Sequence, residues 1–547
     1  MRRFIFALTV VLTSFTLPSF ASEEDSVTSV SVSFGASFPA TGVASPGVAS
    51  YYSGIDAYFS YVNDNGGIYG RKINFIRKDD SSIAGRAMSS NNELISSNTI
   101  LGLISTAPSC SSQAAVISGS NLASKGVPNL FVDCLIDKSS DDSEPSSPAK
   151  TSTSYYSKIS TQNQITLLKS YIDKAFPNQK IVLVYQDDEN ALGISKIKSD
   201  PKILCSKTFP AGAANIALNA IVELCKSNGG IKDGDVVVYS GSPSGLGSLI
   251  TSLLRVNLNL KYFVNDEALN LTALSAMGIR GNLLPEIYSL SSNVLISETS
   301  NEAVKTFLGI GQKYQGSSTM DQRFMNGMNV GYIVSNILGA IGPDLTRERL
   351  MKAMDLYGAQ FDALGLSERS QDATNRFAPL GGVIVKSLGS TSEAVSEVLI
   401  LENGKVSTRP RKQVGISPKG LPLLVQKLPN SAPATKTPTT STTPAPVKSV
   451  APAPAPTQMS DLDGEEELPF GKISVKKEKS KYAIAISSNL PNENVVVRAT
   501  KKGQKSVSFK VTTDDDGFAN FNTSRSLSGF QVALLLDGEI LSSMKAS

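Results

Sequence analysis

Hydroxyl and carboxylate side chains recur in the loops that follow short apolar runs expected to be strands. These residues are Ser45, Ser109, Ser111, Ser112, Ser242, Asp266 and Glu267. The segment from Ser109 to Ser112 opens an expected helix, where backbone N–H groups and the helix dipole favour a carboxylate. A carboxylate such as Glu267 needs a cationic partner if it is buried. The alternative is structural: a serine that caps a helix and an acidic turn at the surface.

The same residues argue against catalysis. The chain has no histidine, which removes Ser-His-Asp and Cys-His chemistry and imidazole metal ligands. Its acidic pairs, such as Asp79-Asp80, Asp187-Asp188 and Asp266-Glu267, are adjacent in sequence, so in strands they point to opposite faces. The sequence has no Cys-x-x-Cys motif, so a zinc site is not expected. We therefore expect no enzyme, no metal and no cofactor.

Apolar runs that alternate with helical patterns predict an α/β fold with parallel strands covered on both faces. The expected strands begin with Val30–Phe34, Lys72–Ile76, Ile100–Ile104 and Val127–Val132, and continue with Lys180–Tyr185, Asp235–Tyr239, Lys261–Val264 and Gly382–Val385. Ligands of open α/β sheets bind outside the carboxyl ends of the strands. Those ends are residues 41–45, 105–112, 239–244 and 265–267.

One stretch, Gly54–Asp80, reads as a helix, a tight turn and a strand. Ile55, Tyr58, Phe59 and Val62 recur at helical spacing and should face a core. Two glycines that follow Asn65 should end the helix, because glycine tolerates the left-handed conformation found there. A strand and the two aspartates close the unit.

The sequence of that stretch resembles the leucine/isoleucine/valine-binding family of type I periplasmic binding proteins. These are the substrate-binding proteins of branched-chain amino acid ABC transporters. The match lies in Gly54, in the run Asn63-x-x-Gly-Gly-Ile-x-Gly-Arg-Lys, and in the aspartate pair. The resemblance extends over about 30–406. It implies two lobes, each a doubly wound parallel sheet, joined by three crossings. Lobe 1 would hold 28–153 and 284–365, and lobe 2 would hold 154–283 and 366–428.

The resemblance also implies site residues. Ser111 or Ser112 matches the serine that binds a ligand carboxylate, and Glu267 matches the acid that binds a ligand ammonium, with Asp266 as the alternative. The sequence departs from the family at Val132-Asp133-Cys134-Leu135, where an Ala-Thr pair is common, and at Pro46 and Ser242, where tyrosines are common. The implied partners are an amino acid-like ligand and the membrane permease of an ABC importer.

Length and composition set the wider organisation. The chain has 547 residues, of which 41% are hydrophobic and 18% are charged, and a net charge of +4. These values are typical of a chain with more than one globular domain. The sequence lacks a basic stripe interleaved with aromatic residues, so we do not expect nucleic acid as a partner. Residues 1–21 read as a secretory signal: two arginines, an apolar run and Ser19-Phe20-Ala21. We expect export to the periplasm or the cell surface, without a lipid anchor at the N-terminus.

Four cysteines are present, two in each expected lobe. In an oxidising compartment the simplest pairing is local, Cys110 with Cys134 and Cys205 with Cys225. Each bridge would close a loop of about twenty residues and contribute about 3 kcal/mol in the chain-entropy model. The alternative is four free buried thiols.

The C-terminal part of the chain differs from the rest in composition and in its pattern of expected strands. Residues 429–465 are rich in Pro, Ala and Thr and are expected to be a linker. Residues 466–547 contain short strands separated by turns, which predicts a small immunoglobulin-like β-sandwich. Asp514-Asp-Asp516 before Gly517 fits a plain turn better than a calcium loop. This added domain supports a second functional hypothesis: a surface receptor or adhesion protein that holds a partner or the wall.

Overall fold

The computed structural model describes residues 26–430 and 471–545. The gaps within these ranges are 42–44, 82, 98, 105–118, 134–152, 188, 211–217, 255–257, 282–283, 317, 373–374, 390, 479–480, 489–493, 502–503, 505, 514–517 and 537–538. The chain forms two compact units, Met1–Lys436 and Thr437–Ser547. The expected signal segment, residues 431–465 of the expected linker and the aspartate-rich turn lie outside the described residues.

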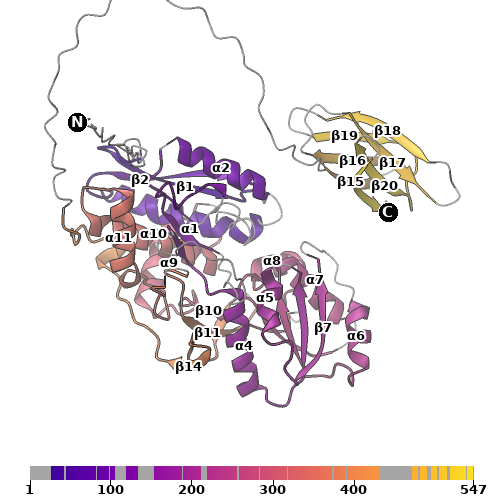
Figure 1. The fold of residues 1–547 in the computed structure, drawn as a ribbon, viewed down its shortest axis with the longest axis horizontal. Coiled ribbons are helices and arrows are strands. Elements are labelled where there is room, and N and C mark those ends of the chain that lie inside the picture. The colour runs from indigo at the N-terminus through magenta and orange to yellow at the C-terminus, as the bar shows by residue number, and fades with distance from the viewer. Residues whose placement is uncertain are drawn as a thin grey trace, which may run out of the picture. The chain divides into compact units, whose positions relative to one another are not determined.

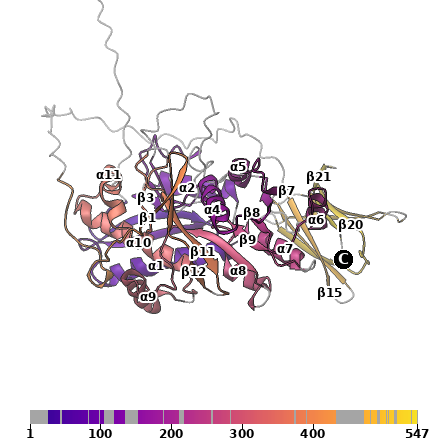
Figure 2. The same ribbon diagram turned by 90° about the horizontal axis from the view of Figure 1, so that it is seen from below.

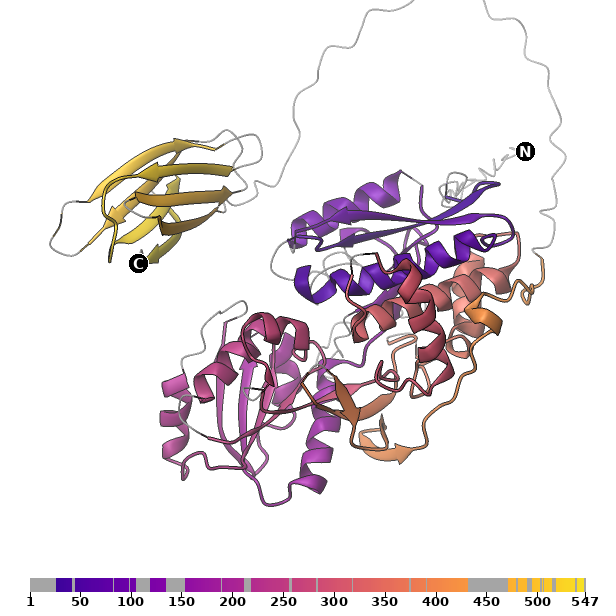
Figure 3. The ribbon, with the colours of Figure 1, turned by 180° about the vertical axis from the view of Figure 1, so that it is seen from behind.

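The first lobe is a parallel sheet between two layers of helices (Figure 3). Its strand order is β2-β1-β3-β4-β5, with β1 (Ser31–Phe38), β2 (Lys72–Asp79), β3 (Gly102–Ile104), β4 (Asn129–Val132) and β5 (Ser154–Tyr156). Helix α2 (Ala84–Ser96) packs on one face. The other face carries α1 (Ser45–Asp64), α9 (Glu302–Tyr314), α10 (Gln322–Ile341) and α11 (Arg347–Tyr357). Burial on both faces explains why the inner strands β3 and β4 are short and mostly apolar, whereas the edge strand β2 alternates between buried and exposed residues.

The second lobe repeats this plan with a larger mixed sheet. Its order is β14-β13-β11-β10-β9-β8-β6-β7, and β12 pairs with β11. The strands are β6 (Ile181–Gln186), β7 (Ile203–Phe209), β8 (Val236–Ser240), β9 (Lys261–Val264), β10 (Glu286–Ser291), β11 (Gly381–Ser387), β12 (Ser392–Ala394), β13 (Val398–Glu402) and β14 (Lys405–Arg409). Helices α4 (Thr161–Ala175) and α5 (Glu189–Ser195) pack on one face, and α6 (Leu218–Lys226), α7 (Pro243–Leu254) and α8 (Leu271–Ala276) on the other (Figure 2). The predicted α/β class is confirmed.

The crossings between the lobes lie a few residues later than expected. Strand β5 pairs with β4 of the first sheet, and β10 pairs with β9 of the second. The chain therefore leaves the first lobe after Tyr156 and the second lobe after Ser291 (Figure 1). It returns to the second sheet near Gly365, which pairs with Asn293 across the crossing.

The segment after β14 runs back along the first lobe, whereas the sequence suggested that it stays with the second. The hydroxyl groups of Tyr58 and Tyr61 in α1 donate to the carbonyl oxygens of Gly420 and Lys419. The backbone N–H of Lys427 donates to Ala340 O at 2.8 Å. Leu428 is buried in the first-lobe core. An extended segment without periodicity gives no sequence signal for its packing partner, and here side-chain hydroxyls of α1 determine it.

Helices α1 and α10 approach each other at backbone contact. A Cβ placed on Gly54 would lie 2.1 Å from the carbonyl oxygen of Phe324, and one on Gly327 would lie 1.9 Å from that of Tyr51. Ile55 and Val62, on the same helix, are buried as predicted. Glycine at both positions is therefore required by space, since any side chain would push the helices apart.

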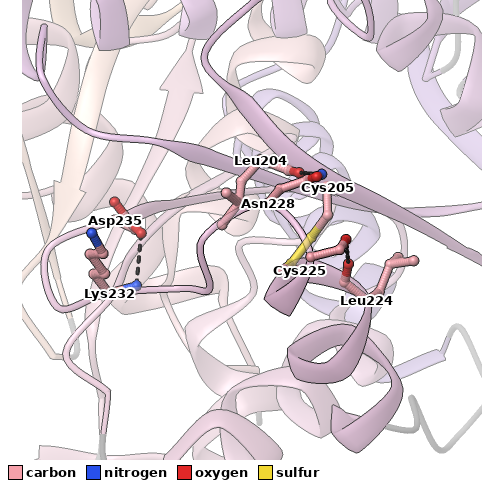
Figure 4. Close-up of a disulfide and its surroundings, with 8 residues drawn as sticks. Leu204, Cys205, Leu224, Cys225, Asn228, Lys232 and Asp235 are labelled. Carbon is pink, nitrogen blue, oxygen red and sulfur yellow. Dashed lines mark hydrogen bonds between the residues drawn. A yellow bond between two sulfur atoms is a disulfide. The ribbon is translucent and has the colours of Figure 1, made fainter.

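The Cys205–Cys225 disulfide joins β7 to α6 and confirms one of the two predicted bridges (Figure 4). Beside it, the Asn228 side-chain amide donates to Leu204 O at 2.6 Å. The other expected pair, Cys110 and Cys134, lies outside the described residues.

The C-terminal unit is an all-β domain of two antiparallel sheets. One has the order β15-β16-β19 and the other β18-β17-β20-β21. The strands are β15 (Gly471–Glu478), β16 (Lys481–Ser488), β17 (Asn494–Thr500), β18 (Val507–Thr512), β19 (Phe518–Thr523), β20 (Gln531–Leu536) and β21 (Glu539–Lys545). Val497, Leu534 and Ile484 belong to its own apolar core. The predicted all-β C-terminal domain is confirmed.

We predict that Gly54→Ala lowers the free energy of unfolding by about 3 kcal/mol, because the added methyl group overpacks the α1–α10 contact. Urea denaturation of the native chain and the variant measures the difference. The matched control is Gly309→Ala in α9, where a Cβ meets no atom within 4 Å. That variant should be neutral or more stable by about 0.5 kcal/mol. Equal effects of both substitutions would contradict the steric explanation.

Candidate ligand site between the lobes

Five charged side chains from both lobes come together, and we refer to them as the interlobe charge cluster. Its members are Asp133, Lys158, Asp266, Glu267 and Arg323. Asp133 follows β4 in the first lobe, and Asp266 and Glu267 follow β9 in the second. These positions are carboxyl ends of parallel strands, which is where α/β sheets bind ligands.

Lys158 connects the two lobes within this cluster. Its Nζ lies 3.1 Å from Asp133 Oδ2 and 3.8 Å from Asp266 Oδ2. It follows β5, at the first crossing, so it can reach an acid of each lobe. Burial disfavours the charge of Lys158, but Asp133 and Asp266 outweigh that effect and raise its pKa above the ordinary value.

Asp266 is held by α4 as well as by Lys158. The Gln164 side-chain amide donates to Asp266 Oδ1 at 3.0 Å, and the Asp266 backbone N–H donates to Gln164 Oε1 at 3.0 Å. Gln164 also donates to the carbonyl oxygen of Ile159 at 2.9 Å. These bonds fix Asp266 in one orientation, so its role is to position Lys158 and the turn after β9.

Glu267 is the acid of the cluster with the fewest contacts. Arg323 Nη2 donates to the backbone oxygen of Glu267 at 3.4 Å, but within the described residues no donor contacts its carboxylate. The side chain is accessible to water, yet protein atoms surround it closely. Desolvation raises the pKa of Glu267 to about 7, while Lys158 opposes the shift and Asp266 adds to it. Near neutral pH the Glu267 side chain is therefore a mixture of its charged and neutral forms.

An aromatic wall of α1 lies next to the first-lobe side of the cluster. Tyr52 is buried, and its ring centre is 4.3 Å from that of Phe38 and 5.5 Å from that of Tyr51. Burial raises the pKa of Tyr52, and the charges of Asp133 and Asp80 add to the shift. The tyrosine is thus neutral and contributes an apolar surface near Asp133.

A buried ion pair lies in the segment of the third crossing. Arg369 Nε and Nη2 lie 2.6 Å and 2.5 Å from Asp362 Oδ2, and both side chains are almost completely inaccessible. The Asn329 amide of α10 donates to Asp362 Oδ1 at 2.8 Å. Burial opposes the charge of Asp362, but Arg369 and Asn329 outweigh it and lower the pKa of Asp362. The pair therefore fixes the crossing to α10.

The structure brings only part of the predicted site together. Asp266 and Glu267 belong to the interlobe charge cluster. Ser242 instead caps α7: its Oγ accepts from the Gly245 N–H at 3.3 Å, and its carbonyl accepts from the Tyr239 hydroxyl at 2.8 Å. Ser45 is the first residue of α1. Ser109, Ser111 and Ser112 lie outside the described residues.

Sequence reasoning missed three members of the cluster: Asp133, Lys158 and Arg323. Asp133 directly follows an apolar strand, which was a usable signal. Lys158 and Arg323 come from a crossing and from the start of a helix, and nothing in their local sequence marks them. The described residues contain no group of three or more potential ligands arranged for a metal ion.

Part of the chain also matches a known protein family in sequence. Residues 31–199 match the family model "Periplasmic binding protein". The two-lobed α/β domain therefore has the fold of periplasmic binding proteins. No curated protein sequence matches the chain significantly. In the part of this domain that the structure describes, and in the β domain, no helix is long and apolar enough to cross a membrane.

Solved periplasmic binding proteins share the fold of this domain. One is a substrate-binding periplasmic protein from Ralstonia solanacearum (TM-score 0.55, 15% identity, 66% of this chain and 99% of that chain). Another is a branched-chain amino acid ABC transporter protein from Thermus thermophilus with bound valine (TM-score 0.54, 15% identity, covering 68% of this chain and 96% of that chain). A third is a fatty acid ABC transporter substrate-binding protein from Thermomonospora curvata (TM-score 0.53, 15% identity, covering 70% of this chain and 95% of that chain). The ligands of these proteins differ in chemistry, so the fold leaves the ligand open.

We predict that Asp362→Asn lowers the free energy of unfolding of the binding-protein domain by about 3 kcal/mol or more, because Arg369 is left buried and unpaired. Chemical denaturation measures the effect. Glu402→Gln, which removes the exposed pair of Glu402 with Arg409, is the control and should change stability by less than about 1 kcal/mol. Comparable losses in both variants would rule out a special role for the buried pair.

The raised pKa of Glu267 predicts a pH-dependent stability. The folded form binds the carboxyl proton more tightly than the unfolded form, so this contribution is full below about pH 4.5 and is lost as the pH rises through about 7. The native chain should therefore lose stability relative to Glu267→Gln over this window. Thermal unfolding of both at several pH values measures the difference. A difference that stays constant with pH would contradict the shift, and Glu402→Gln is the control.

Proposed function

We propose that this chain is an exported solute-binding protein that captures a small ligand with an ammonium group, an amino acid or a related amide, between its two lobes. The observation that carries this proposal is the Glu267 carboxylate, which lies in the interlobe charge cluster without a hydrogen-bond donor among the described residues. Desolvation makes its charged form costly, and a ligand ammonium would stabilise that form.

The charges of the cluster support a cationic group on the ligand. Asp133, Asp266 and Glu267 supply three carboxylates, whereas Lys158 and Arg323 supply two cations. One ligand ammonium would balance the remaining negative charge. The Thermus thermophilus protein of the same fold holds valine, which also carries an ammonium group.

The other end of the ligand is assigned to the serine-rich segment. Ser109, Ser111 and Ser112 are proposed to bind the ligand carboxylate, and Ser45 is proposed to line the first-lobe side of the site. The lobes would close over the ligand, and the liganded form would dock on the permease of an ABC importer. The role is binding without catalysis.

A second candidate function is supported by the C-terminal β domain. Thr437–Ser547 is a compact unit with its own apolar core. Ligand capture between the lobes does not require this unit. A surface receptor or adhesion protein would use it to hold a cell-surface partner or the wall.

We predict that the full chain gains thermal stability with one class among amino acids, short amides, urea and small carboxylates. A ligand at about 100 times its dissociation constant adds about 2.7 kcal/mol of stability. For a ligand with an ammonium group, Glu267→Gln should weaken binding by about 2 kcal/mol, because it removes one partner of a desolvated charge pair.

The affinity should also rise between about pH 6 and 8, as Glu267 ionises through its pKa of about 7. Isothermal titration calorimetry measures both effects, with Glu402→Gln as the control. Unchanged affinity in Glu267→Gln would exclude this residue from the site. A folded chain that responds to no compound would favour the receptor or adhesion hypothesis.

A further inference from the structure

Lys158 places a cation of the protein itself among the acids of the proposed site. Its Nζ lies between an acid of the first lobe, Asp133 at 3.1 Å, and an acid of the second lobe, Asp266 at 3.8 Å. Its side chain is 23% exposed, so part of it remains accessible to solvent. A lysine in this position is already the cationic partner of two of the three carboxylates.

We propose that Lys158 sets the charge selectivity of the site: it satisfies Asp133 and Asp266, leaves Glu267 for one ligand ammonium, and excludes ligands with a second cationic group. This inference rests on the proposed function, because it deepens the assignment of the same site. A basic amino acid or a diamine would bring its second charge close to Lys158 without an acid to pair with it.

The remaining contacts of the cluster support this division of roles. Asp266 is oriented by two hydrogen bonds with Gln164 and so presents its second oxygen to Lys158. Arg323 contacts the backbone oxygen of Glu267 and not its carboxylate. Arg323 therefore does not substitute for Lys158 at the two aspartates.

A purely structural role for Lys158 gives a different expectation. If Lys158 only joined the lobes, its removal would weaken all ligands alike and would create no new affinity. A selectivity role predicts a gain instead, because two carboxylates lose their cation and become available to a ligand. A gain of binding for cationic ligands thus separates the two explanations.

The test uses the full chain with Lys158→Ala and two kinds of probe. The first is n-butylammonium chloride, which has the four carbons and the ammonium group of a lysine side chain; it should raise the melting temperature of the variant more than that of the native chain. The second is the pair L-leucine and L-lysine, compared by calorimetry. The variant should bind L-lysine at least about tenfold more tightly than the native chain does, as expected for a new charge-assisted hydrogen bond.

Three further variants complete the design. Lys158→Arg keeps the charge and should retain the native rejection of L-lysine. Lys226→Ala removes an exposed lysine that pairs with Glu223 in α6, and should match the native chain in both assays. Lys158→Met keeps most of the side-chain volume and replaces Lys158→Ala if the latter does not fold; the L-lysine gain is expected there too.

The outcomes separate this inference from the proposed function. Neither rescue by n-butylammonium nor a gain for L-lysine, in a folded variant, overturns the selectivity role. An equal gain in Lys226→Ala overturns it as well, since the effect would then be one of overall charge. A gain in Lys158→Ala supports it even if the native chain binds no neutral amino acid, a result that would instead count against the proposed ligand class.

Discussion

The backbone contact between α1 and α10 is the constraint on which the rest of the binding-protein domain depends. Gly54 and Gly327 let the two helices touch, and no larger residue fits at either position. The contact at Phe324 lies in the first turn of α10, which Asp321 caps and from which Arg323 reaches the backbone oxygen of Glu267. It also positions Tyr52 at the end of the first sheet. A packing detail in one lobe therefore shapes the electrostatics between the two.

The charges between the lobes follow from the topology of the sheets. Parallel strands end at the same edge, so Asp133 of one sheet and Asp266 and Glu267 of the other face a common region. The crossing after β5 delivers Lys158 to that region. Because three acids meet two cations, a ligand with one ammonium group, as we propose, would complete the balance. Charge, rather than shape, is the property by which we expect this site to discriminate ligands.

Connections as well as sheets hold the two lobes in register. The Asp362–Arg369 pair, with Asn329, ties the third crossing to α10. The extended segment that ends at Leu428 then returns to the first lobe and is held there by Tyr58 and Tyr61. A domain whose lobes move on ligand binding needs such fixed points, because flexible connections would allow motions that do not close the site.

Local patterns in the sequence were enough to predict the helices, the strands and the fold class. Apolar runs marked the strands, Gly66 and Gly67 marked the end of α1, and Asp266-Glu267 marked a strand end, because these signals are local. It also predicted the Cys205–Cys225 bridge, because nearby cysteines pair easily. The folded chain was needed to show that Ser242 caps a helix, that the last segment returns to the first lobe, and that Lys158 lies between two acids. Those outcomes depend on contacts between residues far apart in the chain, and local patterns carry no information about such contacts.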